Sequence, residues 1–216
     1  MKKLVIFDLD GTLIDTIPDI AENVNKTLKE FGFKERSTSE ILGFVNYGAE
    51  KLLRDSIGEK IEEDLFQKAF SFYKLCYKNS TNEKSVVYSG IYNLLEKLKG
   101  NGAILCVYSN KQDEVVQNLI NARFSGVFDS VTGFKQGAKT KPDPSHILSL
   151  IKRFNVDSKN VYMVGDGDTD ILVGINSGVH SVGVSWGYRN KEVLISLGAE
   201  FIADTASAVY DFIFKG

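Results

Sequence analysis

An apolar run that ends in a pair of aspartates constrains the fold of this chain most. Residues 4–7 are apolar and partly β-branched, which is typical of a buried parallel strand. Asp8 and Asp10 follow, and their spacing of two places both side chains on one side of an extended chain. At the carboxyl end of a central strand, where open α/β sheets bind ligands, two carboxylates repel each other unless a cation offsets their charge. Mg²⁺ takes oxygen ligands and often bridges carboxylates and a phosphate, so the pattern favours a magnesium site over two solvated aspartates.

Strand-like and helix-like segments alternate from residue 88 to the end of the sequence. Apolar runs that suit buried strands lie at 103–108, 127–131, 161–164, 180–184 and 201–203, with amphipathic helices expected between them. This alternation is typical of a parallel sheet that helices cover on both faces. The sequence therefore predicts an α/β fold with a doubly wound, mostly parallel sheet, a Rossmann-like core to which the run at 4–7 also belongs.

Residues 15–84 have a different character. Apolar residues recur there at helical spacing, and glycines at 32, 43, 48 and 58 separate four or five short helices without a convincing strand. Because the run at 4–7 belongs with the sheet, this all-helical block is predicted to be an insertion after the first strand. The expected domains are a core of residues 1–14 and 85–216 and a helical insertion of residues 15–84.

The composition excludes several classes of partner. Basic and acidic side chains nearly balance, 26 against 28, so the sequence predicts no nucleic-acid partner. Its apolar runs are far shorter than a membrane span, which predicts no membrane partner. The two cysteines, Cys76 and Cys106, fit no metal-binding spacing and are interpreted as free thiols in a reducing compartment, so a cytoplasmic location is expected. A monomer and a homodimer are both compatible with the sequence.

Chemically useful side chains fall where the predicted strands end. Each has an ordinary alternative: Ser109 could cap a helix, a lysine before proline is often exposed, and an acidic turn is often solvated. Together they supply a nucleophile, charge neutralisation for phosphoryl oxygens and a proton shuttle, which is what phosphoryl transfer requires. The candidate residues are Asp8, Asp10, Ser109, Asn110, Lys141, Asp166 and Asp170.

These residues, in this order, resemble the four motifs of the haloacid dehalogenase-like hydrolases. The motifs map onto Asp8-x-Asp10, Ser109, Lys141, and Gly165-Asp166 with Asp170. The resemblance implies that Asp8 is a nucleophile that forms an aspartyl-phosphate and that Asp10 is the general acid and base, whose backbone carbonyl also reaches the metal.

The same resemblance assigns the remaining groups. It implies that Asp8 and Asp166 bind Mg²⁺ directly and that Asp170 supports the metal site, either directly or through water. Ser109 and Lys141 would hold the phosphoryl oxygens, with Asn110 as a further polar group beside them. Lys139 is a rival of Lys141, but the sequence Lys-Pro at 141–142 matches the family pattern. The helical insertion resembles the family's small helical cap, which closes over the site.

The expected activity is a Mg²⁺-dependent phosphatase that hydrolyses a small phosphorylated metabolite. Segments 15–20, 45–49 and 186–188 are similar to those of phosphoglycolate phosphatases within the family, so 2-phosphoglycolate is the first expected substrate. An inorganic pyrophosphatase or a sugar phosphomutase on the same scaffold is an alternative. A non-enzymatic phospho-receiver, which also combines an acidic pocket with a hydroxyl and a lysine, is a third.

Overall fold

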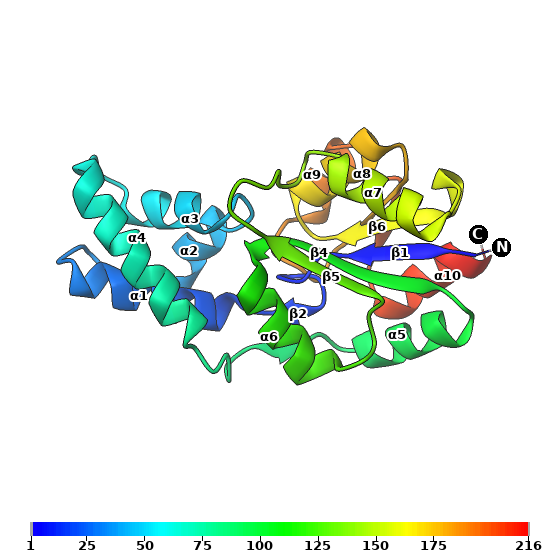
Figure 1. Cartoon of the computed structure of the whole chain (residues 1–216), viewed down its shortest axis with the longest axis horizontal. Coiled ribbons are helices and arrows are strands. Elements are labelled where there is room, and N and C mark those ends of the chain that lie inside the picture. Colours follow the sequence, from blue (N-terminus) through cyan, green and yellow to red (C-terminus); the bar gives the residue numbers. More distant parts are fainter. Residues whose placement is uncertain (1, 216) are drawn as a thin grey trace. The chain divides into compact units, whose positions relative to one another are not determined.

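The computed structural model describes residues 2–215 and divides the chain into two compact units (Figure 1). One unit, here called the core unit, comprises Met1–Asp15 and Val87–Gly216. The other, the helical unit, comprises Thr16–Val86. Two short strands, β2 (Ile14–Asp15) and β3 (Val86–Val87), pair in a separate two-stranded sheet where the chain passes between the units.

A parallel sheet in the order β5-β4-β1-β6-β7-β8 forms the centre of the core unit. β1 lies in its middle, where Leu4 pairs with Ile104 on one side and Val161 on the other, and all four residues of β1 are buried. This arrangement confirms the predicted α/β fold with a parallel sheet. The strands are β1 (Leu4–Phe7), β4 (Ile104–Gln112), β5 (Ser130–Phe134), β6 (Val161–Gly165), β7 (His180–Val184) and β8 (Phe201–Ala203).

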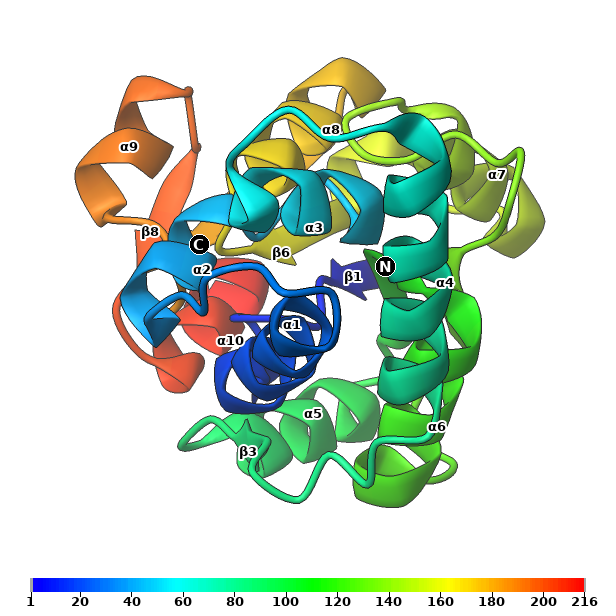
Figure 2. The ribbon, with the colours of Figure 1, turned by 90° about the vertical axis from the view of Figure 1, so that its left-hand side faces the viewer.

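Helices cover both faces of this sheet (Figures 1 and 2). α7 (Ser145–Phe154) and α8 (Asp168–Ser177) lie on one face, and α5 (Ile91–Gly100), α6 (Asp113–Phe124) and α10 (Ala206–Lys215) lie on the other. A 3-10 turn (Ser158–Asn160) precedes β6, and α9 (Lys191–Ser196) precedes β8. Leu4 and Ile6 pack in one cluster with residues of α7 and α8. The alternation of side chains along a strand therefore directs Asp8, two residues beyond Ile6, toward the same face.

Two strands differ from the sequence prediction. β4 continues to Gln112 instead of ending at 108, and β5 spans 130–134 instead of 127–131. The register between β4 and β5 shifts between Tyr108 and Gln112, so the pairing resumes after an irregularity. Polar residues occupy this extension, which is why the apolar pattern ends earlier than the backbone pairing does. As a result, Ser109 lies within a strand and not in the loop after it.

Four helices make up the helical unit over the described segment 16–86: α1 (Ile17–Glu30), α2 (Thr38–Phe44), α3 (Ala49–Ile57) and α4 (Glu63–Lys78). α1 packs against α4, α2 and α3. Ser37 begins α2 with a reciprocal capping box to Glu40, which satisfies backbone groups that the first turn leaves unpaired. Near the two ends of this unit, the buried Ser85 hydroxyl donates to Asp19 Oδ2 at 2.5 Å.

The structure also describes the lengths of the helices and the state of the two cysteines. Over residues 2–215, the structure contains no helix with both the length and the apolar character that crossing a bilayer requires. Cys76 is half-buried and Cys106 is buried, and both are free thiols. Burial raises the pKa of the Cys106 thiol to about 12.

Candidate active site

Three buried carboxylates converge at the carboxyl ends of β1 and β6. The Asp8 N–H donates to Val164 O at 2.9 Å, so Asp8 continues the pairing of β1 with β6. Asp166 directly follows β6, and Asp170 lies in the first turn of α8. One carboxylate oxygen from each of the three aspartates lies within 4.8 Å of the others. A set of close carboxylate oxygens fits a hard divalent cation such as Mg²⁺.

Lys141 joins two of these carboxylates. Its Nζ lies 2.7 Å from Asp8 Oδ1 and 2.6 Å from Asp170 Oδ1, and its side chain is 2% exposed. Asn110 fixes the backbone at this point, because its Oδ1 accepts from Lys141 N–H at 2.9 Å and its Nδ2 donates to Lys141 O at 3.2 Å. Lys139, the rival from the sequence, is 71% exposed and pairs with Asp143. The structure therefore brings Lys141, not Lys139, to the acidic cluster.

Segments far apart in the sequence hold Asp166 in place. Its Oδ1 accepts from Thr12 Oγ1 at 2.7 Å, and its Oδ2 accepts from the Tyr188 N–H at 2.8 Å. Gly11 has a φ of +84°, and a Cβ there would overlap the Asp166 carboxylate. The turn after β1 thus requires glycine both for its backbone conformation and for the close approach of this carboxylate.

Asp170 and Asp168 have different surroundings although they are only two residues apart. Asp170 Oδ2 accepts from the Gly167 N–H at 2.9 Å, which closes the first turn of α8 and fixes the carboxylate toward Lys141. Asp168 instead pairs with Arg189, whose Nε lies 3.3 Å from its Oδ1. Of the acids in this turn, the structure brings Asp166 and Asp170 to Asp8.

Asp10 has a separate lysine partner. Lys111 Nζ donates to Asp10 Oδ1 at 2.6 Å, and the backbone N–H of Lys111 donates to Ser109 Oγ at 3.2 Å. Lys111 is not among the residues predicted from the sequence, because the apolar pattern of its strand ends at 108. The signal that could have found it is the spacing: Ser109 and Lys111 are two residues apart, as are Asp8 and Asp10, which follow the neighbouring strand β1.

Comparison with known protein families identifies the family of this chain. The family model described as haloacid dehalogenase-like hydrolase matches residues 5–184, a range that contains every site residue predicted above. The chain belongs to the haloacid dehalogenase-like hydrolases. The resemblance inferred from the sequence motifs is therefore confirmed, and with it the classification of the chain as an enzyme.

The relatives of this hydrolase extend over nearly its whole length. It is 30% identical to the phosphoglycolate phosphatase of Psychrobacter arcticus, over 99% of this chain and 96% of the relative. It is 33% identical to the phosphoglycolate phosphatase of Aquifex aeolicus, over 86% of each chain. Among solved structures, that of a predicted phosphoglycolate phosphatase from Haemophilus somnus superposes with a TM-score of 0.87, at 26% identity and 97% coverage of each chain.

The electrostatics of the hydrolase site favour cation binding. Burial raises the pKa of the Asp8 carboxyl to about 7, with Lys141 opposing the rise and Asp170 adding to it. Burial also raises the pKa of Asp166 well above its usual range, and the charges of Asp170 and Asp8 add to this effect. Burial alone would lower the pKa of Lys141, but Asp170 and Asp8 outweigh it and raise that pKa. If all three carboxylates are ionised, one ammonium leaves two negative charges in a buried cluster, which a divalent cation would balance.

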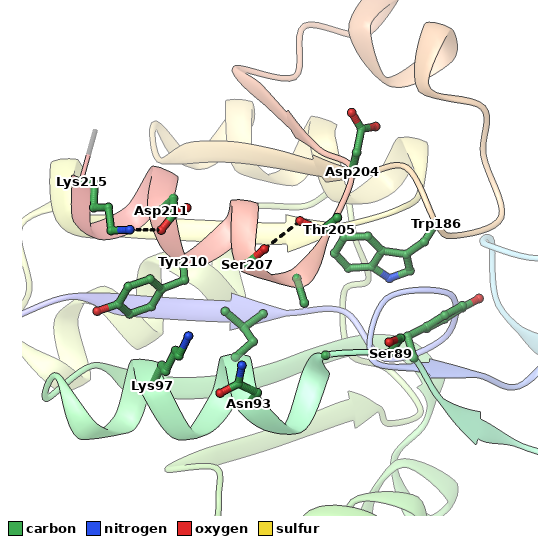
Figure 3. Close-up of a pocket in the computed structure, with 14 residues that line it drawn as sticks. Ser89, Asn93, Lys97, Trp186, Asp204, Thr205, Ser207, Tyr210, Asp211 and Lys215 are labelled. Atoms are coloured by element: carbon green, nitrogen blue, oxygen red, sulfur yellow. Dashed lines mark hydrogen bonds and ion pairs between the residues drawn. The ribbon is translucent and has the colours of Figure 1, made fainter.

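A hollow of about 650 Å³ lies elsewhere in the core unit (Figure 3). It is bounded by α5, by α10 along its length and by Trp186, whose indole Nε1 donates to Thr12 O at 3.1 Å. The residues that line this hollow do not include the aspartates or lysines of the acidic cluster. The hollow is therefore a feature separate from the candidate active site, and Trp186, which lines it, contacts Thr12, whose hydroxyl donates to Asp166.

Proposed function

We propose that this hydrolase is a Mg²⁺-dependent phosphomonoesterase that acts on a small phosphorylated metabolite, with 2-phosphoglycolate as the first substrate to test. The observation that carries the proposal is the convergence of Asp8, Asp166 and Asp170 around the buried ammonium of Lys141. The names of relatives that match nearly the whole chain support the choice of substrate.

The proposed reaction has two steps. In the first, an Asp8 carboxylate oxygen bonds to phosphorus while the bond between phosphorus and the ester oxygen breaks, and Asp10 gives its proton to the departing alkoxide. In the second, Asp10 takes a proton from water as the water oxygen bonds to phosphorus, which breaks the bond to Asp8 and releases inorganic phosphate. Asp10 is then protonated again, so the cycle closes without another reactant.

Other residues are proposed to bind the cation and the phosphoryl oxygens. Asp8, Asp166 and Asp170, together with the backbone carbonyl of Asp10, would hold Mg²⁺, which when bound neutralises the carboxylates and the phosphoryl oxygens. The Lys141 ammonium, close to Asp8, would bind a phosphoryl oxygen. The Ser109 hydroxyl would bind another.

Two more residues and the helical unit complete the proposal. Asn110, which holds the backbone of Lys141 on both sides of its Cα, would act mainly by fixing that lysine and also by lining the substrate site. The helical unit, residues 16–86, is proposed to be the cap, which carries specificity determinants beyond those of the core unit.

The test is a substrate screen with matched variants. Released phosphate is measured for 2-phosphoglycolate, sugar phosphates, nucleotides and pyrophosphate, with Mg²⁺ and with EDTA. Asp8→Asn should abolish turnover while the fold is retained, whereas Asp168→Asn, in the acidic turn but paired with Arg189, should stay active. Appreciable activity of Asp8→Asn would refute the nucleophile assignment. Preference for pyrophosphate or conversion of a sugar phosphate to its isomer would instead favour the alternatives.

A further inference from the structure

Lys111 is a buried cation that the proposed reaction does not use. Its side chain is 5% exposed, and it reaches the site only because β4 continues beyond Ser109. Its ammonium lies 2.6 Å from Asp10 Oδ1. Burying an ammonium is costly even when it is paired, and an apolar residue of similar volume often serves stability equally well. Stability alone therefore does not account for a lysine at this position.

The contact with Asp10 fixes where Lys111 lies relative to a bound ester. To protonate the departing oxygen, the Asp10 carboxyl must come within about 2.6–3.2 Å of it. Lys111 Nζ is 2.6 Å from Asp10 Oδ1, so the ammonium lies within about 8 Å of the ester oxygen, whichever oxygen of Asp10 carries the proton. Because the Asp10 carboxyl itself occupies the place next to the ester oxygen, the ammonium beside it is within reach of a group on the neighbouring carbon of the substrate.

A carboxylate on the carbon next to the ester oxygen meets this requirement. Its oxygens lie roughly 3 Å from the ester oxygen by ordinary bond lengths, which places them within reach of a hydrogen bond from Lys111. An ammonium and a carboxylate form a strong charge-assisted hydrogen bond in a site shielded from water. Lys141 is assigned to a phosphoryl oxygen in the proposed reaction, and Lys111, which pairs with Asp10, is the other lysine that the described residues bury at the site.

We propose that Lys111 is a specificity-determining residue that binds a carboxylate attached to the carbon next to the phosphate ester oxygen, so that the enzyme selects phosphate esters of 2-hydroxycarboxylates. This inference rests on the proposed function, because it uses Asp10 as the acid. The competing interpretation is that Lys111 only orients Asp10. That role would affect all phosphate esters equally, whereas carboxylate binding affects only esters that carry the carboxylate.

The first experiment compares 2-phosphoglycolate with ethyl phosphate, in which a methyl group replaces the carboxylate. Lys111→Met should lower kcat/KM for 2-phosphoglycolate at least tenfold more than for ethyl phosphate, since one hydrogen bond to a charged group has about this effect. Lys111→Arg, which keeps the charge, should restore part of the preference. The control Lys159→Met removes a lysine that also pairs with an aspartate but is 71% exposed, and its preference should equal that of the wild type. An equal loss for both esters, or no loss, would overturn the inference.

The second experiment measures binding without turnover, in two variants that both lack the Asp10 carboxylate. Asp10→Asn is compared with the double variant Asp10→Asn/Lys111→Met for binding of 3-phosphonopropionate and propylphosphonate, by calorimetry with Mg²⁺ present. Loss of Lys111 should weaken the binding of 3-phosphonopropionate at least tenfold and leave the binding of propylphosphonate nearly unchanged. Equal weakening of the binding of both ligands would contradict carboxylate binding by Lys111. If the wild type hydrolyses no phosphate ester, the proposed function fails, while this binding comparison still decides the inference about Lys111.

Discussion

Gly187 offers a direct way to disturb the proposed metal site without removing a charged group. A Cβ at this position would lie 2.5 Å from Gly11 O and 2.5 Å from Asp166 Cγ, where ordinary contact begins near 3.4 Å. The φ of Gly187 lies outside the left-handed region, so alanine can adopt the backbone and the cost arises from packing. We expect Gly187→Ala to displace Asp166 and to weaken Mg²⁺ binding.

The loss of folding stability in Gly187→Ala depends on how far Gly11 O and the Asp166 side chain can move away from the added Cβ. Gly11 O belongs to the turn that positions Asp10, and the Asp166 side chain is fully buried and held by two hydrogen bonds. Neither neighbour can rotate away, so the cost should approach the upper end of the range for overpacking, about 1–3 kcal/mol. For a chain of this length, about 3 kcal/mol corresponds to a fall in melting temperature of about 6–12 °C.

The assay is thermal unfolding with EDTA and with Mg²⁺, followed by a Mg²⁺ titration. Gly100→Ala is the matched control, because a Cβ at the end of α5 would have no neighbour within 4 Å. The control should melt at or slightly above the wild-type temperature. If Gly187→Ala melted with the wild type and bound Mg²⁺ equally well, the packing of Asp166 described here would be refuted.

Three further predictions concern single groups of the core unit. Thr12→Val removes the hydroxyl that donates to Asp166 and should weaken Mg²⁺ binding about tenfold in a calorimetric titration, with the fold retained. In EDTA the folded state keeps the Asp8 proton up to about pH 7, while the unfolded chain releases it near pH 3.8. The free energy of unfolding should therefore fall by roughly 4 kcal/mol between pH 4 and 8. Denaturant titrations should show a smaller fall for Asp8→Asn. Burial and a pKa of about 12 should keep Cys106 unreactive, so a thiol reagent should modify only Cys76 in the native protein and both thiols after denaturation.

The residues that the sequence identified share a local signal. Asp8 and Asp10 follow an apolar run at a spacing of two, and Asp166 follows another such run, so their place at the ends of neighbouring strands could be predicted. The fold was predictable for the same reason, because most strands and helices of the core carry their own periodicity; the polar end of β4 and the bounds of β5 are the exceptions. The assignment of catalytic roles came from the resemblance to the family and remains a proposal.

The residues that the sequence analysis did not identify depend on contacts between distant segments. Thr12 and Tyr188 hold Asp166 across separations of 154 and 22 residues, and no local pattern records such pairs. Lys111 was overlooked because a run of polar residues resembles a loop, whereas pairing with β5 keeps that run in the sheet. The close approach of Gly187 to Asp166 is equally invisible in the sequence.

The two aspartates of the first motif show how one short segment can supply two different groups. Asp8 and Asp10 are two residues apart, yet Asp8 faces Lys141 and the buried acids, while Asp10 faces Lys111. The two ion pairs share no atom, so substituting one lysine removes the partner of one aspartate and leaves the contact of the other in place. The proposed division of roles between nucleophile and acid therefore rests on two separate ion pairs, which single substitutions of Lys141 and of Lys111 can perturb one at a time.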